Sequence, residues 1–172
     1  MLSDDRRDKI FNILRESSEP ITGTELSKKT GVSRQIIVQD VALMRAKGLN
    51  IFATPQGYLL PGDDANKTTK VIATNHDRNG MRKELEIIVD NGGKVIDVIV
   101  EHSLYGEIKA MLMLASRLDI ENFMQHYENS DTKPLSALTG GVHLHTIEVA
   151  DEISYEHIIK QLDIFGYLIN SR

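Results

Sequence analysis

Apolar residues in the first part of the chain recur at intervals of three and four, the spacing of helices that bury one face. Residues 4–16 carry this repeat at Ile10, Phe11, Ile13 and Leu14, and residues 34–47 carry it at Ile37, Val41 and Met44. Between these segments, Thr22-Gly23-Thr24-Glu25 has the form of a capping box, in which the first and fourth side chains bond each other's amides. The pattern therefore predicts three helices, the second over residues 22–29.

A tight turn and a hairpin complete this first segment. Gly31 can adopt the left-handed conformation that follows a helix, and Ser33 can cap the next one. Further on, the apolar residues 51–53 and 58–60 flank the turn Thr54-Pro55-Gln56-Gly57 and predict a two-stranded hairpin. Helix, helix, turn, helix and hairpin in this order is the layout of a winged helix-turn-helix.

The outward face of the third helix carries polar side chains suited to DNA. A helix fits the major groove of DNA, where side chains near its N-terminus reach the base edges; Arg can pair with guanine, and Gln can pair with adenine or a phosphate. The candidate DNA contacts are Ser33, Arg34, Gln35, Gln39 and Arg45. Two alternatives stay open: an ordinary solvated helix face, or a winged domain that binds another protein.

Beyond residue 68, strand-like runs alternate with helical segments. Helices are predicted over residues 81–90, after a cap at Asp119, and after a cap at Ser154 with Phe165 on the buried face. Strands are predicted over residues 70–75, 94–100, 107–115 and 142–149. The order βαββαβα predicts an α+β sandwich, in which a mainly antiparallel sheet has its helices on one face.

Two of the predicted strands, residues 94–100 and 107–115, are apolar on both faces. Three helices can cover only one face of the sheet, so we expect the other apolar face to bind a second copy of the chain. The sequence thus predicts a homodimer.

The stretch Pro61-Gly62-Asp63-Asp64-Ala65-Asn66-Lys67-Thr68 is typical of a linker and divides the chain into residues 1–60 and 69–172. Nine Lys and Arg stand against seven Asp and Glu in residues 1–60, whereas the counts are eleven and eighteen in residues 61–172. The formal net charge of −5 therefore hides a mildly basic first domain, so it does not argue against contact with DNA phosphates.

Three absences in the sequence narrow the possible classes of protein. There is no Cys, which excludes disulfides and thiolate metal sites. The longest apolar run, residues 110–115, is far too short for a membrane-spanning helix, and acidic residues follow Met1 where a secretory signal needs basic ones. We therefore expect a cytoplasmic protein with no membrane partner.

The triplet His143-Leu144-His145 is the most informative group of candidate metal ligands in the sequence. In a strand, residues two apart project to the same face roughly 6.5–7 Å apart, so both imidazoles can bind one metal ion. His76 ends the first predicted strand of this domain and Glu84 lies in the following helix, so a strand-to-helix turn can bring both to one end of the sheet. Three imidazoles and a carboxylate suit Zn, Ni, Co or Fe(II). The alternative is a half-exposed His pair with no ligand.

Several short segments are similar, in order and spacing, to the three-histidine (3H) domain. They are Asn75-His76 with Glu84, His102 with Tyr105-Gly106-Glu107, Ser116-Arg117 with Asp119 and Phe123, Leu135-Ser136 with Leu138-Thr139, and residues 141–146. Residues 31–48 resemble the winged helix of the biotin-operon repressor type, and the whole chain resembles the niacin-responsive transcriptional repressors of bacteria. Those proteins usually have Pro after the histidine corresponding to His102, where this chain has Ser103.

The resemblance implies a phosphocarrier-like topology for the second domain and one divalent transition metal per subunit, bound by His76, Glu84, His143 and His145. It also implies a homodimeric repressor that binds an inverted-repeat operator in double-stranded DNA. Nicotinic acid would act as co-repressor for genes of NAD-precursor (niacin) biosynthesis or uptake. The candidate effector contacts are His76, His102, Tyr105, His143 and His145.

Two other functions remain open at this point. In a metalloregulator the ion itself would be the signal. A metal-dependent hydrolase fused to a DNA-binding domain would need an open metal position and a nearby general base. Four protein ligands with no additional base in the motif argue against the hydrolase, so we expect no enzyme activity. His126 and His157 lie among polar neighbours and receive no role.

Overall fold

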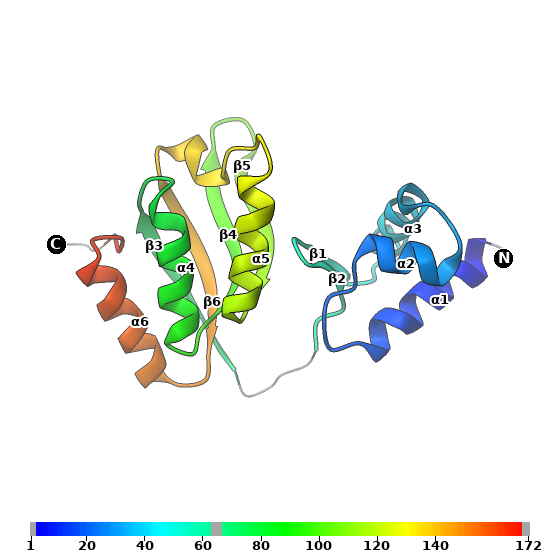
Figure 1. Cartoon of the computed structure of the whole chain (residues 1–172), viewed down its shortest axis with the longest axis horizontal. Coiled ribbons are helices and arrows are strands. Elements are labelled where there is room, and N and C mark those ends of the chain that lie inside the picture. Colours follow the sequence, from blue (N-terminus) through cyan, green and yellow to red (C-terminus); the bar gives the residue numbers. More distant parts are fainter. Residues whose placement is uncertain (1–2, 63–66, 170–172) are drawn as a thin grey trace. The chain divides into compact units, whose positions relative to one another are not determined.

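The computed structural model describes residues 3–62 and 67–169 and divides the chain into two compact units, residues 1–63 and 64–172 (Figure 1). Residues 63–66 of the predicted linker lie outside the described residues. Within the described ranges, no helix has the length and apolar character needed to cross a membrane.

The first unit consists of three helices followed by a hairpin. The helices are α1 (Ser3–Glu16), α2 (Gly23–Thr30) and α3 (Arg34–Ala46), and the hairpin pairs β1 (Phe52–Thr54) with β2 (Gly57–Leu59) in antiparallel register. Its core contains the apolar residues of the predicted repeat, namely Ile10, Leu14, Leu26, Ile37, Val41, Met44 and Ile51. The predicted winged helix-turn-helix is confirmed.

Local hydrogen bonds explain where α2 and α3 begin. Thr22 and Glu25 form both halves of the capping box, with the Glu25 amide donating to Thr22 Oγ1 at 3.1 Å and the Thr22 amide donating to Glu25 Oε2 at 3.0 Å. Gly31 follows α2 with φ 72°, and Ser33 Oγ accepts from the Ile36 amide at 3.3 Å. These caps are the ones that the sequence predicted.

A buried carboxylate fixes α3 against α1. Asp40 is 2 % exposed, and its oxygens accept from Arg6 Nε at 2.6 Å and from an Arg7 guanidinium nitrogen at 3.1 Å. Since this side of α3 faces α1, the opposite side of the helix is left exposed. The sequence analysis assigned no role to Asp40.

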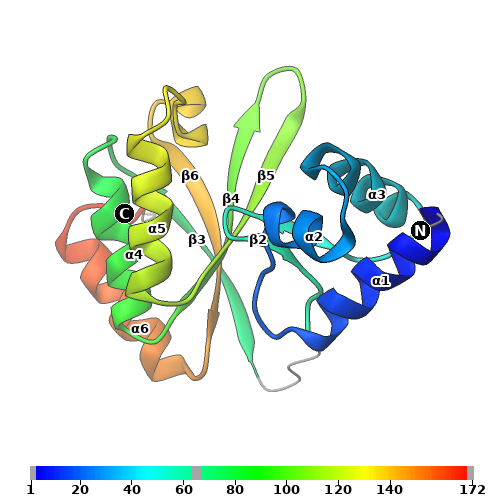
Figure 2. The ribbon, with the colours of Figure 1, turned by 45° about the vertical axis from the view of Figure 1, so that its right-hand side comes forward.

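The second unit is a four-stranded antiparallel sheet in the order β3-β6-β4-β5. Figures 1 and 2 show α4, α5 and α6 on one face of this sheet. Its elements are β3 (Thr68–Asn75), α4 (Gly80–Asp90), β4 (Lys94–His102), β5 (Gly106–Leu114), α5 (Arg117–Glu128), the 3₁₀ helix η1 (Leu135–Thr139), β6 (Val142–Val149) and α6 (Glu152–Ile164). The predicted α+β class and the βαββαβα order are confirmed.

The predicted caps of α5 and α6 are wrong by one helical turn. Ser116 caps α5, and Asp119 is the third helical residue, whose carboxylate accepts from the Ser116 amide at 2.9 Å. Asp151 caps α6 and accepts from the Ser154 amide at 2.7 Å. Both members of each pair are residue types that cap helices, so composition alone does not decide between them.

Two further differences concern loops at the ends of elements. The segment between α5 and β6, for which no helix or strand was predicted, contains η1, a single short turn with no strong periodic pattern. Phe165, predicted on the buried face of the last helix, is 45 % exposed because α6 ends at Ile164. After α6 the chain turns back to β3, where the Asn75 amide donates to the Tyr167 carbonyl at 2.8 Å.

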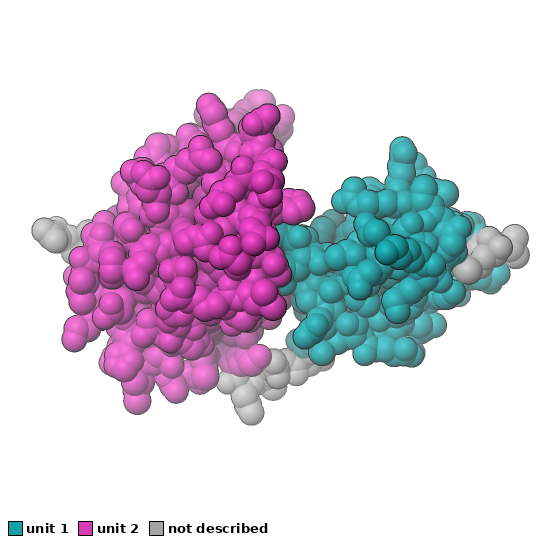
Figure 3. Space-filling view, in the orientation of Figure 1, with its two compact units in different colours: residues 1–63 teal, residues 64–172 magenta. Residues whose placement is uncertain are grey.

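Each unit has its own apolar core. Figure 3 shows the residues of the two units in different colours. The core of the second unit lies between the sheet and its three helices. Its fully buried members include Ile88 of α4, Val95 of β4, Ile147 of β6 and Ile158 of α6. Because Ile147 is two residues from His145 on β6, the predicted histidine pair belongs to this same inner face.

Candidate functional site

Four side chains that the sequence analysis grouped together meet inside the second unit. His76 follows β3, Glu84 lies on α4, and His143 and His145 lie on β6. In the register of β3 with β6, Thr74 pairs with His143 and Ile72 pairs with His145, so both histidines lie on the face that the helices cover. Glu84 is 1 % exposed and each of the two β6 histidines is 3 % exposed.

One carboxylate oxygen is the common partner of all three imidazoles. Glu84 Oε2 lies 2.6 Å from His76 Nε2, 3.1 Å from His143 Nε2 and 3.3 Å from His145 Nε2. The ligand atoms of His76, Glu84 and His143 lie within 4.8 Å of one another, the spacing of a group that can bind a metal ion. The structure therefore brings together all four residues predicted as metal ligands.

The second nitrogen of each ring is bonded to a backbone carbonyl. The distances from Nδ1 are 2.7 Å to the Asp77 oxygen for His76, 2.7 Å to the Gly141 oxygen for His143, and 2.6 Å to the Asp97 oxygen for His145. A carbonyl only accepts, so each Nδ1 carries a hydrogen and donates it. Each Nε2 is then the atom left to bind a proton or a metal.

This arrangement needs positive charge at its centre. Three neutral rings would direct three Nε2 lone pairs at a carboxylate oxygen, which is repulsive unless protons or a cation lie between them. Burial raises the pKa of the Glu84 carboxyl, but the charge of His145 and hydrogen bonds from the three imidazoles lower it well below its usual value. Burial lowers the pKa of His76 and of His145, but Glu84 outweighs it and both are raised.

Two further polar atoms in or beside the cluster could bind a metal ion or a small ligand. Glu84 Oε1 is buried and has no hydrogen-bond partner among the residues that the structure describes. Such an atom is costly to bury unless something binds it. Thr74, which is fully buried, places Oγ1 3.1 Å from His143 Nε2.

Two glycines allow the backbone to approach the rings closely. A Cβ added at Gly80 would lie 2.7 Å from His76 Cγ, and one added at Gly141 would lie 2.6 Å from both Asn75 Oδ1 and the His76 carbonyl oxygen. Any larger residue at either position would displace His76. The sequence analysis missed Gly80, for which the only signal was a glycine at the start of the helix after His76.

Tyr167 was also missed. Its ring centroid lies 5.1 Å from that of His76, and the adjacent Leu168 bridges to Thr74 of β3. This contact joins the end of the described chain to the end of β3 and the turn that follows it, and no local pattern in the sequence indicates it.

The other two predicted effector contacts, His102 and Tyr105, lie at the end of β4 and in the turn to β5. His102 Nδ1 accepts from the Leu104 amide at 3.1 Å and from the Tyr105 amide at 3.3 Å. The Tyr105 side chain is 73 % exposed. These contacts shape the turn, and neither residue belongs to the group formed around Glu84.

In the first unit, the predicted DNA contacts share the exposed side of α3. Ser33 caps this helix, and Arg34, Gln35, Gln39 and Arg45 are all exposed. Val38, to which the sequence analysis gave no role, is 43 % exposed on the same helix. The face therefore combines hydrogen-bonding groups, which can pair with base edges, with an apolar one, which can contact a thymine methyl group.

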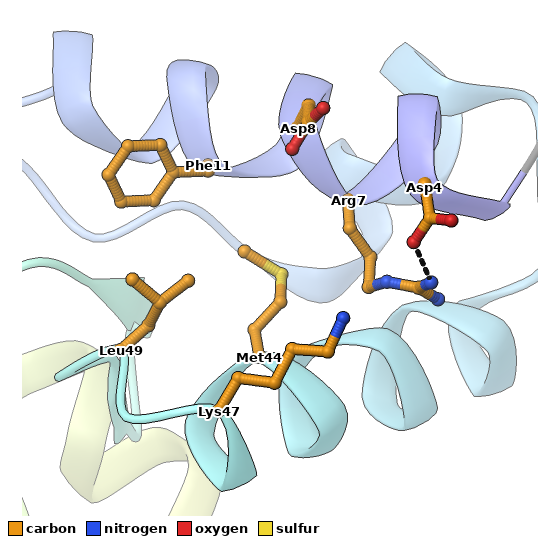
Figure 4. A pocket seen from close by; sticks show the side chains of 7 residues that line it. All are labelled: Asp4, Arg7, Asp8, Phe11, Met44, Lys47 and Leu49. Atoms are coloured by element: carbon orange, nitrogen blue, oxygen red, sulfur yellow. Dashed lines mark hydrogen bonds and ion pairs between the residues drawn. The ribbon is translucent and has the colours of Figure 1, made fainter.

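A pocket of about 280 Å³ lies elsewhere in the first unit, between α1 and the end of α3 (Figure 4). Its lining consists of Asp4, Arg7, Asp8, Phe11, Met44, Lys47 and Leu49. Arg7 donates at 2.5 Å to Asp4, one turn earlier on α1, and also contacts Asp40 of α3. None of the predicted site residues line it.

Comparisons with known proteins agree with this division. Residues 69–171 match the family model described as the 3H domain, and residues 6–59 match one described as an HTH domain. A protein of Thermotoga maritima named "Probable transcription repressor NiaR" is 43% identical over 165 residues, which cover 96% of this chain and 94% of that protein. A protein of Bacillus subtilis named "Transcription repressor NadR" is 38% identical over 172 residues, which cover 98% of this chain and 96% of that protein.

Both relatives are similar to this chain over nearly its full length. The two domain models match the first and the second unit in the same order along the chain. The chain therefore belongs to the family of transcription repressors that join an N-terminal helix-turn-helix domain to a C-terminal 3H domain.

Proposed function

We propose that this chain is a DNA-binding transcription repressor whose second unit senses nicotinic acid at a site for one divalent transition metal. The target genes would serve biosynthesis or uptake of the NAD precursor niacin. Its near full-length relatives are named transcription repressors, which supports a regulatory rather than an enzymatic role. The observation that carries the sensing part is the convergence of three Nε2 atoms on one carboxylate oxygen of Glu84.

The donor atoms of this cluster fit a metal ion of intermediate hardness. Nitrogen from His76, His143 and His145 and oxygen from Glu84 suit Ni, Zn, Co or Fe(II), and no thiolate is available in a chain without Cys. The unpartnered Glu84 Oε1 supports the same assignment. A bound divalent ion would supply positive charge for an anionic carboxylate and a position for a pyridine nitrogen.

The residues of this chain would orient the effector. His76, with Tyr167 against its ring, forms one side of the cluster, and Thr74 provides a hydroxyl beside His143. His102 and Tyr105 remain candidate effector contacts from the β4–β5 turn. Nicotinic acid would act as co-repressor by favouring the form that binds DNA, with a coupling of about 1–3 kcal/mol.

A metalloregulator is the second candidate, because the same four donors support it equally well. In that case the metal alone would change operator binding and nicotinic acid would add nothing. A hydrolase would need a separate general base, but among the described residues the carboxylate that contacts the three imidazoles is Glu84, which is itself a proposed ligand. The cluster therefore offers no separate general base among its described contacts.

The helix-free face of the sheet supports a homodimer. Ala73, Leu144 and Ile99 are cross-strand neighbours on β3, β6 and β4, which places three apolar side chains in one row. Val71, two residues before Ala73, is 59 % exposed. A two-fold dimer through this face would present two α3 helices to an inverted-repeat operator.

We expect Arg34→Ala and Gln35→Ala to lose discrimination between operator and scrambled DNA by about 1–3 kcal/mol each, because each removes a candidate base contact. The measurement is a titration of both DNAs at one salt concentration. Arg15→Ala, which removes the same charge from α1, is the control and should affect both DNAs alike. Wild-type discrimination in both α3 variants would show that this face does not read bases.

Replacing His143 with Ala should lower metal occupancy and abolish nicotinic-acid-dependent operator binding, because it removes one of four donors. His126→Ala, a change of an exposed histidine on α5, should leave both unchanged. Metal content and operator binding are measured with metal alone, nicotinic acid alone and both. Unchanged nicotinic acid affinity in a metal-free His143→Ala protein would separate the effector from the ion.

The metal-free protein should lose stability as the pH rises above about 6.5. The raised pKa values of His76 and His145 favour folding while these rings are protonated, and this contribution is lost as pH rises through the folded values. Saturating metal should reverse the trend, because the ion replaces the protons. Thermal unfolding with chelator or with metal between pH 6 and 8 checks this, and Glu84→Gln should flatten the metal-free profile.

The wild-type chain should sediment as a dimer at micromolar concentration, and Val71→Glu should shift it toward monomer by placing charge on the helix-free face. Leu118→Glu is the matched control, since Leu118 is 68 % exposed on α5 at the opposite face. A monomeric wild-type protein would contradict the proposed interface, as would a Val71→Glu variant that stays fully dimeric.

A further inference from the structure

An irregularity in β4 lies directly beside the metal cluster. Between the paired positions Val95 and Ile147 and the next paired positions Ile99 and Leu144, β4 advances four residues and β6 advances three. One extra residue on one strand is the definition of a β-bulge. The β4–β5 pairing shifts at the same place, between Val95 and Asp97.

Asp97 occupies this bulge and provides two hydrogen-bond acceptors in it. Its backbone carbonyl accepts from His145 Nδ1 at 2.6 Å. Its carboxylate oxygen Oδ1 accepts from the Thr146 amide at 2.9 Å. In a regular ladder a backbone carbonyl of β4 would accept the β6 amide. Here a side-chain oxygen accepts that amide, and the backbone carbonyl accepts an imidazole N–H instead.

The burial of Asp97 shows that this carboxylate belongs to the structure. The residue is 3 % exposed, and its ion pair with Lys109 is long, with Nζ 3.8 Å from Oδ2. A carboxylate is rarely buried unless its oxygens have partners. The Thr146 amide is therefore the principal partner that keeps Asp97 in place.

The three imidazoles of the cluster differ in what holds them. The carbonyls of Asp77 and Gly141, which bind His76 and His143, belong to connecting segments outside the strands. The carbonyl that binds His145 belongs to the interior of β4. In a regular ladder this carbonyl would accept an amide of the neighbouring strand, so it is free to accept from the His145 ring because the ladder is interrupted there.

We propose that Asp97 is a positioning residue for the metal centre. By accepting the Thr146 amide, its carboxylate maintains the bulge that leaves its own carbonyl to His145 Nδ1, and so directs Nε2 toward Glu84. The inference rests on the proposed metal site and adds a residue outside the four ligands. Fixing the second nitrogen of a ligating histidine in this way typically changes metal affinity 10–100-fold.

The test compares variants that keep or remove the acceptor. Asn at position 97 retains an oxygen for the Thr146 amide, so Asp97→Asn should bind Zn(II) and Co(II) within a few-fold of wild type. Asp97→Ala removes the acceptor and should bind about 10–100-fold more weakly. Its Co(II) absorption spectrum should also change, because the position of His145 changes. Asp97→Leu, which preserves volume in the strand, should behave like Asp97→Ala and serves if that variant fails to fold.

Two controls separate positioning from general effects on the sheet. Glu148→Ala removes a partly buried carboxylate from the neighbouring strand β6, where it is paired with Lys67, and should leave metal affinity unchanged. Lys109→Met removes only the long ion pair to Asp97 and should do the same. Affinities come from chelator competition on the full chain.

The outcomes are distinct. Wild-type affinity and spectrum in folded Asp97→Ala or Asp97→Leu would overturn the proposal. Equal losses in Asp97→Asn and Asp97→Ala would overturn it as well, since charge rather than the retained acceptor would then matter. Failure of the wild-type chain to bind either metal would instead refute the proposed metal site, independently of any variant at position 97.

Discussion

The second unit depends on the burial of one carboxylate. An isolated carboxylate in a protein interior is prohibitively costly, and Glu84 is 1 % exposed within the apolar core between α4 and the sheet. Three histidines, one directly after β3 and two on β6, compensate it at a single oxygen. Positive charge among these four groups, whether protons or a metal ion, is thus a condition for this packing.

Much of the surrounding backbone follows from that condition. Each ring needs a carbonyl for Nδ1, and these carbonyls come from the turn after β3, the segment before β6 and the bulge in β4. Gly80 and Gly141 have no side chain because His76 and its backbone occupy the space. A change in the charge at the centre therefore acts on α4, β6 and β4 together, since all three contribute to the same few bonds.

The parts of the molecule that sequence could predict are those with local signals. The capping box at Thr22, the glycine at position 31 and the two-residue spacing of His143 and His145 each depend on neighbours in the chain. The side chains of His143 and His145 lie beside those of His76 and Glu84 as expected, because strand alternation and a short strand-to-helix turn leave few other arrangements.

What the sequence did not reveal depends on contacts between distant segments. Asp40 and Asp97 are acids that resemble ordinary surface residues until their partners, Arg6 and the Thr146 amide, are placed beside them. Tyr167 reaches His76 only because the chain after α6 returns to β3. The caps of α5 and α6 were misplaced for a different reason, since two suitable residues stood three positions apart in each case.

The interactions that position α3 all lie within the first unit. Asp40 joins α3 to two arginines of α1, Ser33 caps its start, and Ile37, Val41 and Met44 bury its inner face in a separate core. None of these interactions involves the second unit, so the fold around α3 does not depend on the charge at Glu84. Under the proposed function, sensing would therefore alter how two intact α3 helices are presented to the two half-sites of an operator, leaving the reading of bases within each half-site unchanged.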